Sequence, residues 1–330
     1  MKLFQPLFLS LLCCGLLCCK KEKKTPVVAG PDYKAYFFKT DSVPCPGASG
    51  GTVVWDSVAY AAPSFNPGNA AELLYLRYTP SRQEYRIDKV NLKTGAKATV
   101  YSTTGQVIST CAWGKNNQVL FCAAAAANPE GHFDLYRIQD DGTGQTQLTQ
   151  GGDVNQVRFN YDQTQYLYSS RSTGNSYIAN LADNRITDTL THQLGVLDAW
   201  GHPYYLVYPD TIGLRYFDIP HRQVVDVTEV SWPATQMRGG CTWLNDALTI
   251  LYAEPDGIYS FSTQNRKKQK LVSSCGRREY TGTVAYAPIA RKLVWQRVEY
   301  LPGDNGTTRA RSQLIMMSIN GEDRQVMVLP

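Results

Sequence analysis

The chain has 330 residues, of which 43% are hydrophobic and 18% charged; these proportions fit a folded globule and exclude a disordered polar chain. Of its formal net charge of +5, Lys2 and the KKEKK run at 20–24 supply four, which leaves +1 for residues 25–330. A folded part so close to neutral lacks the positive surface that binds nucleic acid phosphates, so we expect no nucleic acid partner.

Residues 1–19 (MKLFQPLFLSLLCCGLLCC) form a short apolar run behind one lysine. The run is shorter than the ~20 residues that span a bilayer and fits the hydrophobic region of a secretory signal. Its end, LLCC, resembles the bacterial lipoprotein signal, in which an aliphatic, a variable and a small residue precede the lipidated cysteine. The resemblance implies that Cys19 becomes an acylated N-terminus, with Cys18 and Cys14 as lesser candidates. A cleaved signal peptide with incidental cysteines is the alternative.

The segment that follows, residues 20–51, is interpreted as a tether that opens with KKEKKTPVVAGPD, which has neither a strand nor a helix pattern. An acylated N-terminus holds a protein to a lipid membrane surface without crossing it. The resemblance to lipoproteins implies an outer membrane location facing the periplasm, because the stretch after Cys19 is basic rather than the acidic kind associated with surface export.

Cysteines recur beyond the leader, at Cys45, Cys111, Cys122, Cys241 and Cys275. An exported protein allows disulfides, although an odd count leaves at least one thiol unpaired. If a turn centres on residues 116–117, two of these cysteines, Cys111 and Cys122, stand opposite each other and are the best candidates for a disulfide. The alternative, that all five are buried apolar thiols, stays open. No Cys or His pair has zinc-ligand spacing, and we expect no metal or cofactor.

The composition predicts an all-β fold. The chain has 21 Tyr, 26 Gly and 17 Pro residues, a combination that suits many short strands joined by turns. No window beyond the leader shows a long apolar pattern of helical period.

A repeat unit is clearest in residues 133–168. It contains a strand from Phe133 to Ile138, a turn at 141–144, and a short strand ending at Thr149. A further strand, 154–159, then leads through a polar turn to an aromatic strand at 166–168. Four strands with three kinds of connection form one unit.

The same unit recurs six times, as an aromatic residue, a polar turn, and two apolar residues about seven and nine positions later. The leading aromatics are Phe65, Trp113, Phe159, Trp200, Trp243 and Tyr286, and the copy at Trp200 is the most degraded. The strands that close the units lie 37 to 57 residues apart, near Val100, Leu148, Leu190, Val227, Leu271 and Val328. This spacing is close to the ~40–50 residues of a four-stranded propeller blade, so we predict a six-bladed β-propeller over residues 52–330. A β-sandwich or two smaller β domains are the alternatives.

The segments DLYRIQDDGTGQTQLT and FNYDQTQYLYSS resemble the TolB-like β-propeller repeat. The resemblance covers about residues 52–330 and implies the fold, but a fold does not carry a role or a partner with it. Tyr33 to Phe38 precede the first unit. They either add an outer strand to the last blade and lock the ring or form a covering loop.

Propellers usually bind ligands at the mouth of the central channel, which the innermost strands line. The polar and aromatic residues predicted there are Arg158, His192, Asp198, Arg238, Trp243, Arg278 and Tyr280. A mixture of Arg, Asp and aromatic residues can hold a carboxylate, a peptide end or a sugar. The alternative is that these residues bond one another or hold channel waters. The loop predicted at 298–311 is a second candidate contact surface.

No catalytic signature is present. The sequence lacks a Gly-x-Ser-x-Gly elbow, and its glycine-rich pieces lie in expected hairpin loops. The first hypothesis is therefore a membrane-anchored, non-enzymatic propeller that binds an envelope protein or glycan. The alternative is a propeller-type polysaccharide lyase or glycosidase, which requires two carboxylates or a metal in the channel. A structural subunit of an envelope complex is a third hypothesis.

Overall fold

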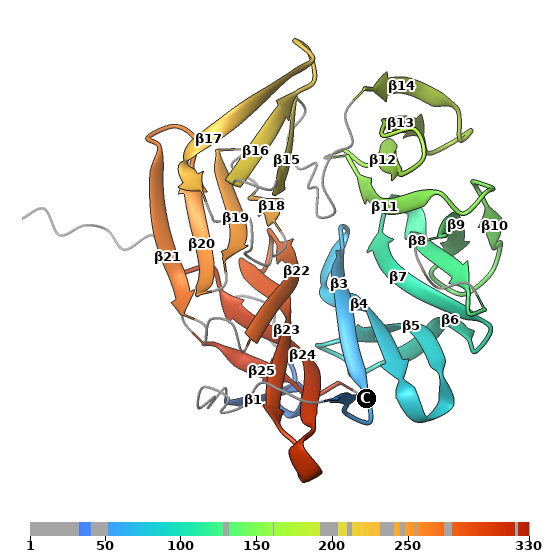
Figure 1. The fold of residues 1–330 in the computed structure, drawn as a ribbon, viewed down its shortest axis with the longest axis vertical. Coiled ribbons are helices and arrows are strands. Elements are labelled where there is room, and N and C mark those ends of the chain that lie inside the picture. The colour runs from blue at the N-terminus through green and yellow to red at the C-terminus, as the bar shows by residue number, and fades with distance from the viewer. Residues whose placement is uncertain are drawn as a thin grey trace, which may run out of the picture.

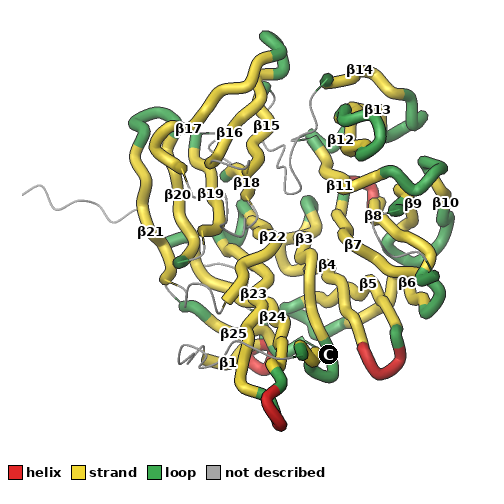
Figure 2. The backbone as a smooth tube through the Cα atoms, in the orientation of Figure 1, coloured by secondary structure: helices red, strands yellow, loops and turns green. Residues whose placement is uncertain are grey.

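The computed structural model describes residues 33–40, 52–127, 132–160, 162–191, 204–209, 213–231, 241–244, 248–254, 256–273, 279–320 and 323–329. Strands account for nearly all of the regular structure in these ranges (Figure 2), which confirms the all-β prediction. Within these ranges no helix has the length and apolar character needed to span a bilayer. The 3-10 turns are η1 (Ala35–Phe37), η2 (Pro80–Arg82), η3 (Lys115–Asn117) and η5 (Asp304–Gly306).

The described strands form six sheets arranged around a common centre (Figure 1), which confirms the six-bladed propeller. Blade 1 consists of β3 (Ala59–Asn66), β4 (Asn69–Thr79), β5 (Glu84–Asn91) and β6 (Lys97–Thr103). Blade 2 consists of β7 (Gln106–Trp113), β8 (Gln118–Ala125), β9 (Asp134–Gln139) and β10 (Thr146–Gln147). Blade 3 consists of β11 (Val154–Phe159), β12 (Gln165–Ser170), β13 (Ser176–Asn180) and β14 (Ile186–Leu190).

The second half of the ring is less regular. Blade 4 has three described strands, β15 (Tyr205–Pro209), β16 (Gly213–Asp218) and β17 (Gln223–Ser231), and the stretch around Trp200 lies outside the described residues. Blade 5 consists of β18 (Cys241–Trp243), β19 (Thr249–Glu254), β20 (Gly257–Ser262) and β21 (Lys267–Ser273). Blade 6 consists of β22 (Glu279–Ala287), β23 (Lys292–Pro302), β24 (Thr308–Ser318) and β25 (Gln325–Met327), and it also takes in β1 (Phe38–Thr40) and β2 (Val53–Trp55).

The hydrophobic core is divided among the junctions between neighbouring blades. Six clusters of buried residues are found in the described part of the chain, one at each junction. The two apolar residues of each repeat lie on one face of the second strand, as Leu73 and Tyr75 do in blade 1 and Ile250 and Tyr252 in blade 5, and that face packs against the preceding blade. The spacing of the repeat predicted the blades because this pair of apolar residues recurs wherever one blade packs against the preceding blade.

Residues 33–40 close the ring by joining blade 6 to blade 1. β1 pairs with β25 as a further outer strand, with Phe38 opposite Met327. In the other direction the Tyr33 hydroxyl donates to the Ala70 carbonyl at 2.5 Å, and the Lys34 amide donates to the Leu92 carbonyl at 2.7 Å. Of the two predictions for this segment, the ring-closing strand is therefore right, although it begins at Phe38 rather than Tyr33.

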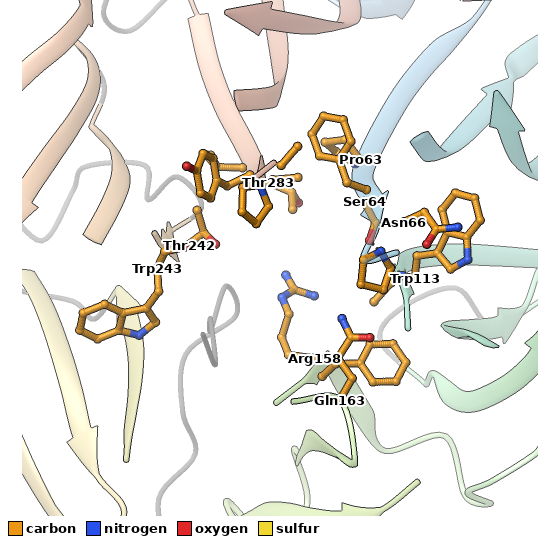
Figure 3. A pocket seen from close by; sticks show the side chains of 18 of the residues that line it. Pro63, Ser64, Asn66, Trp113, Arg158, Gln163, Thr242, Trp243 and Thr283 are labelled. Atoms are coloured by element: carbon orange, nitrogen blue, oxygen red, sulfur yellow. Dashed lines mark hydrogen bonds between the residues drawn. The ribbon is translucent and has the colours of Figure 1, made fainter. Parts of the chain in front are cut away.

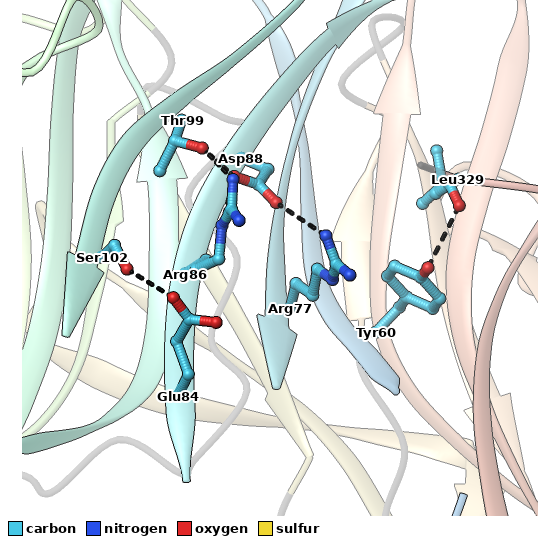
Figure 4. Close-up of polar contacts among 8 residues, drawn as sticks. All are labelled: Tyr60, Arg77, Glu84, Arg86, Asp88, Thr99, Ser102 and Leu329. Atoms are coloured by element: carbon cyan, nitrogen blue, oxygen red, sulfur yellow. Dashed lines mark hydrogen bonds and ion pairs between the residues drawn. The ribbon is translucent and has the colours of Figure 1, made fainter. Parts of the chain in front are cut away.

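Blade 1 and blade 6 also contact each other directly. The Tyr60 hydroxyl donates to the Leu329 carbonyl at 3.1 Å (Figure 4), and the Ser312 hydroxyl donates to the Tyr60 carbonyl at 2.6 Å. Phe37 is 1% exposed in the cluster between the two blades. Hydrogen bonds and apolar packing together seal the junction at which the chain's first and last strands meet.

The prediction of a loop at 298–311 is wrong, since this segment is the distal part of a hairpin formed by two long strands. β23 and β24 stay paired from Lys292 opposite Ser318 to Pro302 opposite Thr308. The strand pattern is disguised in the sequence because Arg297 and Glu299 occupy buried positions on β23, at 2% and 0% exposure. Glu299 is held by an ion pair with Arg297 at 3.3 Å and by hydrogen bonds from Arg311 at 2.6 and 2.9 Å.

The disulfide proposed between Cys111 and Cys122 is also wrong. Both residues are buried free thiols. The three-residue turn η3 sets the register so that Cys111 stands opposite Phe121 and Cys122 stands opposite Thr110. A shift of one residue reverses the face on which a side chain lies. Cys111 accordingly packs between blades 1 and 2, and Cys122 packs between blades 2 and 3.

Replacing Phe37 with alanine tests the closure. Because Phe37 is buried between blades 6 and 1, F37A is expected to lower the free energy of unfolding by about 3–5 kcal/mol. Lys39, an exposed residue of the same segment, is the control, and K39A is expected to change it by less than about 0.5 kcal/mol. Denaturant titration measures both, and equal values for the two variants would contradict a sealing role.

Because two thiols are buried, we expect the free energy of unfolding to fall at alkaline pH. Burial raises the pKa of Cys111 and of Cys122 to about 12, whereas an unfolded thiol ionises near pH ~8.5. The thiols' contribution is therefore complete below pH ~8.5 and is lost as the pH rises toward 12, because only the unfolded chain ionises. Above pH ~9 the free energy of unfolding should fall by up to about 1.4 kcal/mol per pH unit per thiol.

Denaturant titrations at several pH values between ~8 and ~10 measure this slope. The double variant C111A/C122A should show a shallower slope than the unmodified chain. An unchanged slope would mean that the two thiols do not titrate in this way.

Candidate binding site in the central channel

A cavity of about 410 Å³ lies at one mouth of the central channel. The innermost strands of five blades, β3, β7, β11, β18 and β22, surround the middle of the ring (Figure 1). Their C-terminal ends line the cavity together with the turns that follow them, which contribute Pro67, Lys115, Gln163, Leu244 and Ile289. Residues at equivalent positions of five blades therefore line one cavity.

Two successive positions of the repeat line this cavity in every described inner strand. The leading aromatics, among them Phe65 and Trp113, pack in the clusters between blades. Side chains alternate along a strand, so the residue before each aromatic lies on the opposite face of its strand. All five such residues line the cavity beside the aromatics. They are Ser64, Ala112, Arg158, Thr242 and Ala285.

Arg158 is the charged member of these five residues. Its guanidinium reaches into the cavity between Ser64 on one side and Thr242 and Thr283 on the other (Figure 3). Nη1 donates to the Val157 carbonyl at 2.7 Å and lies 3.4 Å from the Thr110 hydroxyl. These bonds come from the strand that carries it and from the neighbouring blade, and they hold the planar guanidinium at the cavity.

The rest of the lining supplies hydroxyl and amide groups. The Ser64 hydroxyl accepts from the Trp113 amide at 2.9 Å, which joins the inner strands of blades 1 and 2. The Lys115 ammonium donates to the Asp162 carbonyl at 2.5 Å, bridging the rims of blades 2 and 3. Thr242 and Gln163 face the same space (Figure 3). These groups can orient a polar ligand around the guanidinium.

The charged side chains in the described part of the lining are all basic. Lys115 and Arg158 line the cavity, and no Asp, Glu or His does so among the residues that the structure describes. Nor do the described ranges hold a group of three or more His, Cys, Asp or Glu residues that could bind a metal. A glycosidase needs two carboxylates that flank the bond it cleaves. The described lining offers none, and it favours an anionic ligand instead.

The structure brings only part of the predicted site together. Arg158 reaches the cavity, and Trp243, which is 5% exposed and belongs to the core between blades 4 and 5, also lines it. Tyr280 lies on β22, where its backbone pairs with Val298, three residues before the first cavity residue of that strand, Thr283. Four predicted residues lie outside the described ranges: His192, Asp198, Arg238 and Arg278.

Sequence reasoning missed Ser64, Lys115, Gln163, Thr242 and Thr283. A signal for two of them was present, because Ser64 and Thr242 directly precede a leading aromatic of the repeat, as Arg158 does. Lys115 and Gln163 lie in turns, and their approach to the cavity depends on how each turn folds. Lys115 belongs to η3, and Gln163 adopts a left-handed backbone with φ of 58°.

Comparison with known proteins adds little to this geometry. No protein-family model matches the chain, and no curated protein matches it either. Among solved structures, the crystal structure of TolB from Acinetobacter baumannii is similar with a TM-score of 0.37 and 14% identity, over 81% of this chain and 54% of that one. The chain thus spans about half the length of that structure. The likeness is too weak to carry an argument about function.

Proposed function

We propose that the propeller is a non-enzymatic binding module whose ligand enters the channel mouth and places an anionic group on Arg158. The observation that carries this proposal is the placement of Arg158 in a cavity whose described lining has basic but no acidic side chains. A carboxylate on a guanidinium forms a strong, charge-assisted pair, and the planar fork fixes its orientation.

The rim of the cavity favours an envelope protein over a glycan as the partner. Ile289 lines the mouth and is 68% exposed, and Pro67 and Leu244 contribute further apolar surface. An exposed apolar side chain beside a cavity with basic side chains is complementary to a polypeptide that carries an acidic group next to an apolar one. An acidic glycan would satisfy Arg158 but would leave the apolar rim uncovered.

The proposal includes attachment to a membrane surface through the residues before the propeller. An acyl chain on Cys19 followed by the tether at 20–51 would hold the ring at the outer membrane, on the periplasmic side. The sequence around Cys19 supports this part of the proposal. A tethered ring would meet partners embedded in or bound to the same membrane at raised effective concentration.

Crosslinking and recovery from membranes test the ligand site. The partner recovered with the unmodified chain should be reduced at least about tenfold with R158Q, because the charge-assisted bond to the carboxylate is lost. Arg171, an exposed residue in a turn of blade 3 outside the cavity lining, provides the control R171Q, which should recover the partner as before. If the unmodified chain is retained on a glycan column and no specific protein is recovered with it, the proposal of a protein partner is contradicted.

Replacing Cys19 tests the anchor separately. In cells that express the full chain, C19S is expected to move the protein from the detergent phase to the aqueous phase in Triton X-114 partitioning, since the acylated residue is absent. C14S, which changes a lesser candidate in the same leader, should leave the partitioning unchanged. Detergent-phase recovery of C19S would show that another residue carries the lipid or that the chain is held otherwise.

A further inference from the structure

The strand β2 forms an edge of the blade 6 sheet that differs from the other edges. It lies parallel to β24, with Val53 opposite Thr308 and Trp55 opposite Ala310. β24 pairs with β23 on its other side, so the order here is β23, β24, β2. Within the described residues no strand pairs with the outer side of β2. We call this outer side, with the side chains of Val53, Val54 and Trp55, the β2 edge.

The β2 edge is apolar and exposed. Val53, Val54 and Trp55 are 48%, 51% and 42% exposed, so both faces of the strand meet solvent. The outermost strands of the other blades carry polar or charged residues, which discourage pairing with another chain. These include Lys97 in β6, Gln147 in β10, Asp188 in β14, Asp226 in β17 and Lys267 in β21. Such protection is missing from β2.

Backbone hydrogen bonds show which amides of β2 face outward. The Thr308 amide donates to the Thr52 carbonyl at 3.0 Å, and the Asp56 amide donates to the Ala310 carbonyl at 2.9 Å. A parallel ladder uses alternate residues of each strand, so the peptide groups of Thr52, Val54 and Asp56 face β24. The N–H and C=O groups of Val53 and Trp55 therefore point away from the sheet.

The strand is held in place rather than loosely attached. Asp56 at its end forms an ion pair with Arg309 of β24. The partner residues Thr308 and Ala310 are 3% and 0% exposed. The β2 edge is thus a fixed, extended template, and a strand that pairs with it does not have to order it first.

We propose that the β2 edge is a self-association surface that pairs antiparallel with the β2 edge of a second copy of this chain, about a two-fold axis at Val54. The symmetry places Val53 opposite Trp55 of the other copy, and these are the residues whose peptide groups point outward. Each such pair exchanges two hydrogen bonds, and Val54 faces its own counterpart in a pair without them. Apolar side chains then cover one another on both faces.

A second copy fits better than an unrelated strand because the edge is self-complementary. The residues beside the three apolar positions are the neutral Thr52 and Asp56, whose charge is already paired with Arg309, so the two-fold brings no unpaired charges together. A contact of three residues on each side is far smaller than the ~20–30 of a stable interface. We therefore expect a weak, concentration-dependent dimer.

Cysteine crosslinking of the full chain tests the register, with Cys45 and Cys275 replaced by serine in every variant. An antiparallel pair without hydrogen bonds has Cα atoms about 4.5 Å apart, which a disulfide can bridge. V54C should give a crosslinked dimer on mild oxidation, several-fold above the matched control I186C, which alters a residue 47% exposed on the outer strand β14. V53C and W55C should each stay at the control level alone and crosslink when mixed.

Sedimentation of the unmodified chain and of V54K provides a second readout that needs no cysteine. The unmodified chain should shift toward the dimer as its concentration rises, and V54K should remain monomeric with an unchanged thermal melt. Crosslinking of V54C no greater than that of I186C would overturn the proposal. So would stronger crosslinking of V53C or W55C alone than of V54C, or a monomer at every concentration.

Discussion

The structure depends on the seal between blade 6 and blade 1. Each blade presents an apolar face that only its neighbour can cover, so a ring with one open junction would leave two such faces in water. Residues 33–40 provide the seal by pairing with β25 and bonding to blade 1, and Phe37 fills the space between. The mouth of the channel exists in a fixed shape because five inner strands are held at set positions around this closed ring.

Within each blade the repeat places a core residue next to a second residue that lines the cavity. The leading aromatic of each described inner strand packs in the core between blades and borders the cavity, and the residue before it also lines the cavity. The core residue has to stay large and apolar, but its neighbour can vary without opening the ring. Arg158 occupies the variable position in blade 3, and the same position holds Ser64, Ala112, Thr242 and Ala285 in other blades. The chemistry of the cavity is thus set by residues that packing does not fix.

The sequence predicted the blades well because the repeated apolar pair reports directly which face of a strand is buried. It predicted the register poorly. The η3 turn moved Cys122 opposite Thr110 rather than Cys111, a one-residue shift that local sequence did not reveal. The extension of the β23–β24 hairpin over residues 298–311 was missed because Arg297 and Glu299, which form an ion pair, occupy buried positions and break the apolar alternation of a strand. Of the site, Arg158 was found because it lies on a repeat strand, while Lys115 and Gln163 depend on turn geometry.

A partner's anionic group is proposed to enter the channel mouth and pair with Arg158. A structure of the chain in complex with a partner recovered from membranes tests it most directly. We expect a carboxylate of the partner about 2.7–2.9 Å from the Arg158 guanidinium, with an apolar side chain against Ile289. A partner bound to the outer strands of the blades, with the cavity holding only solvent, would contradict the account.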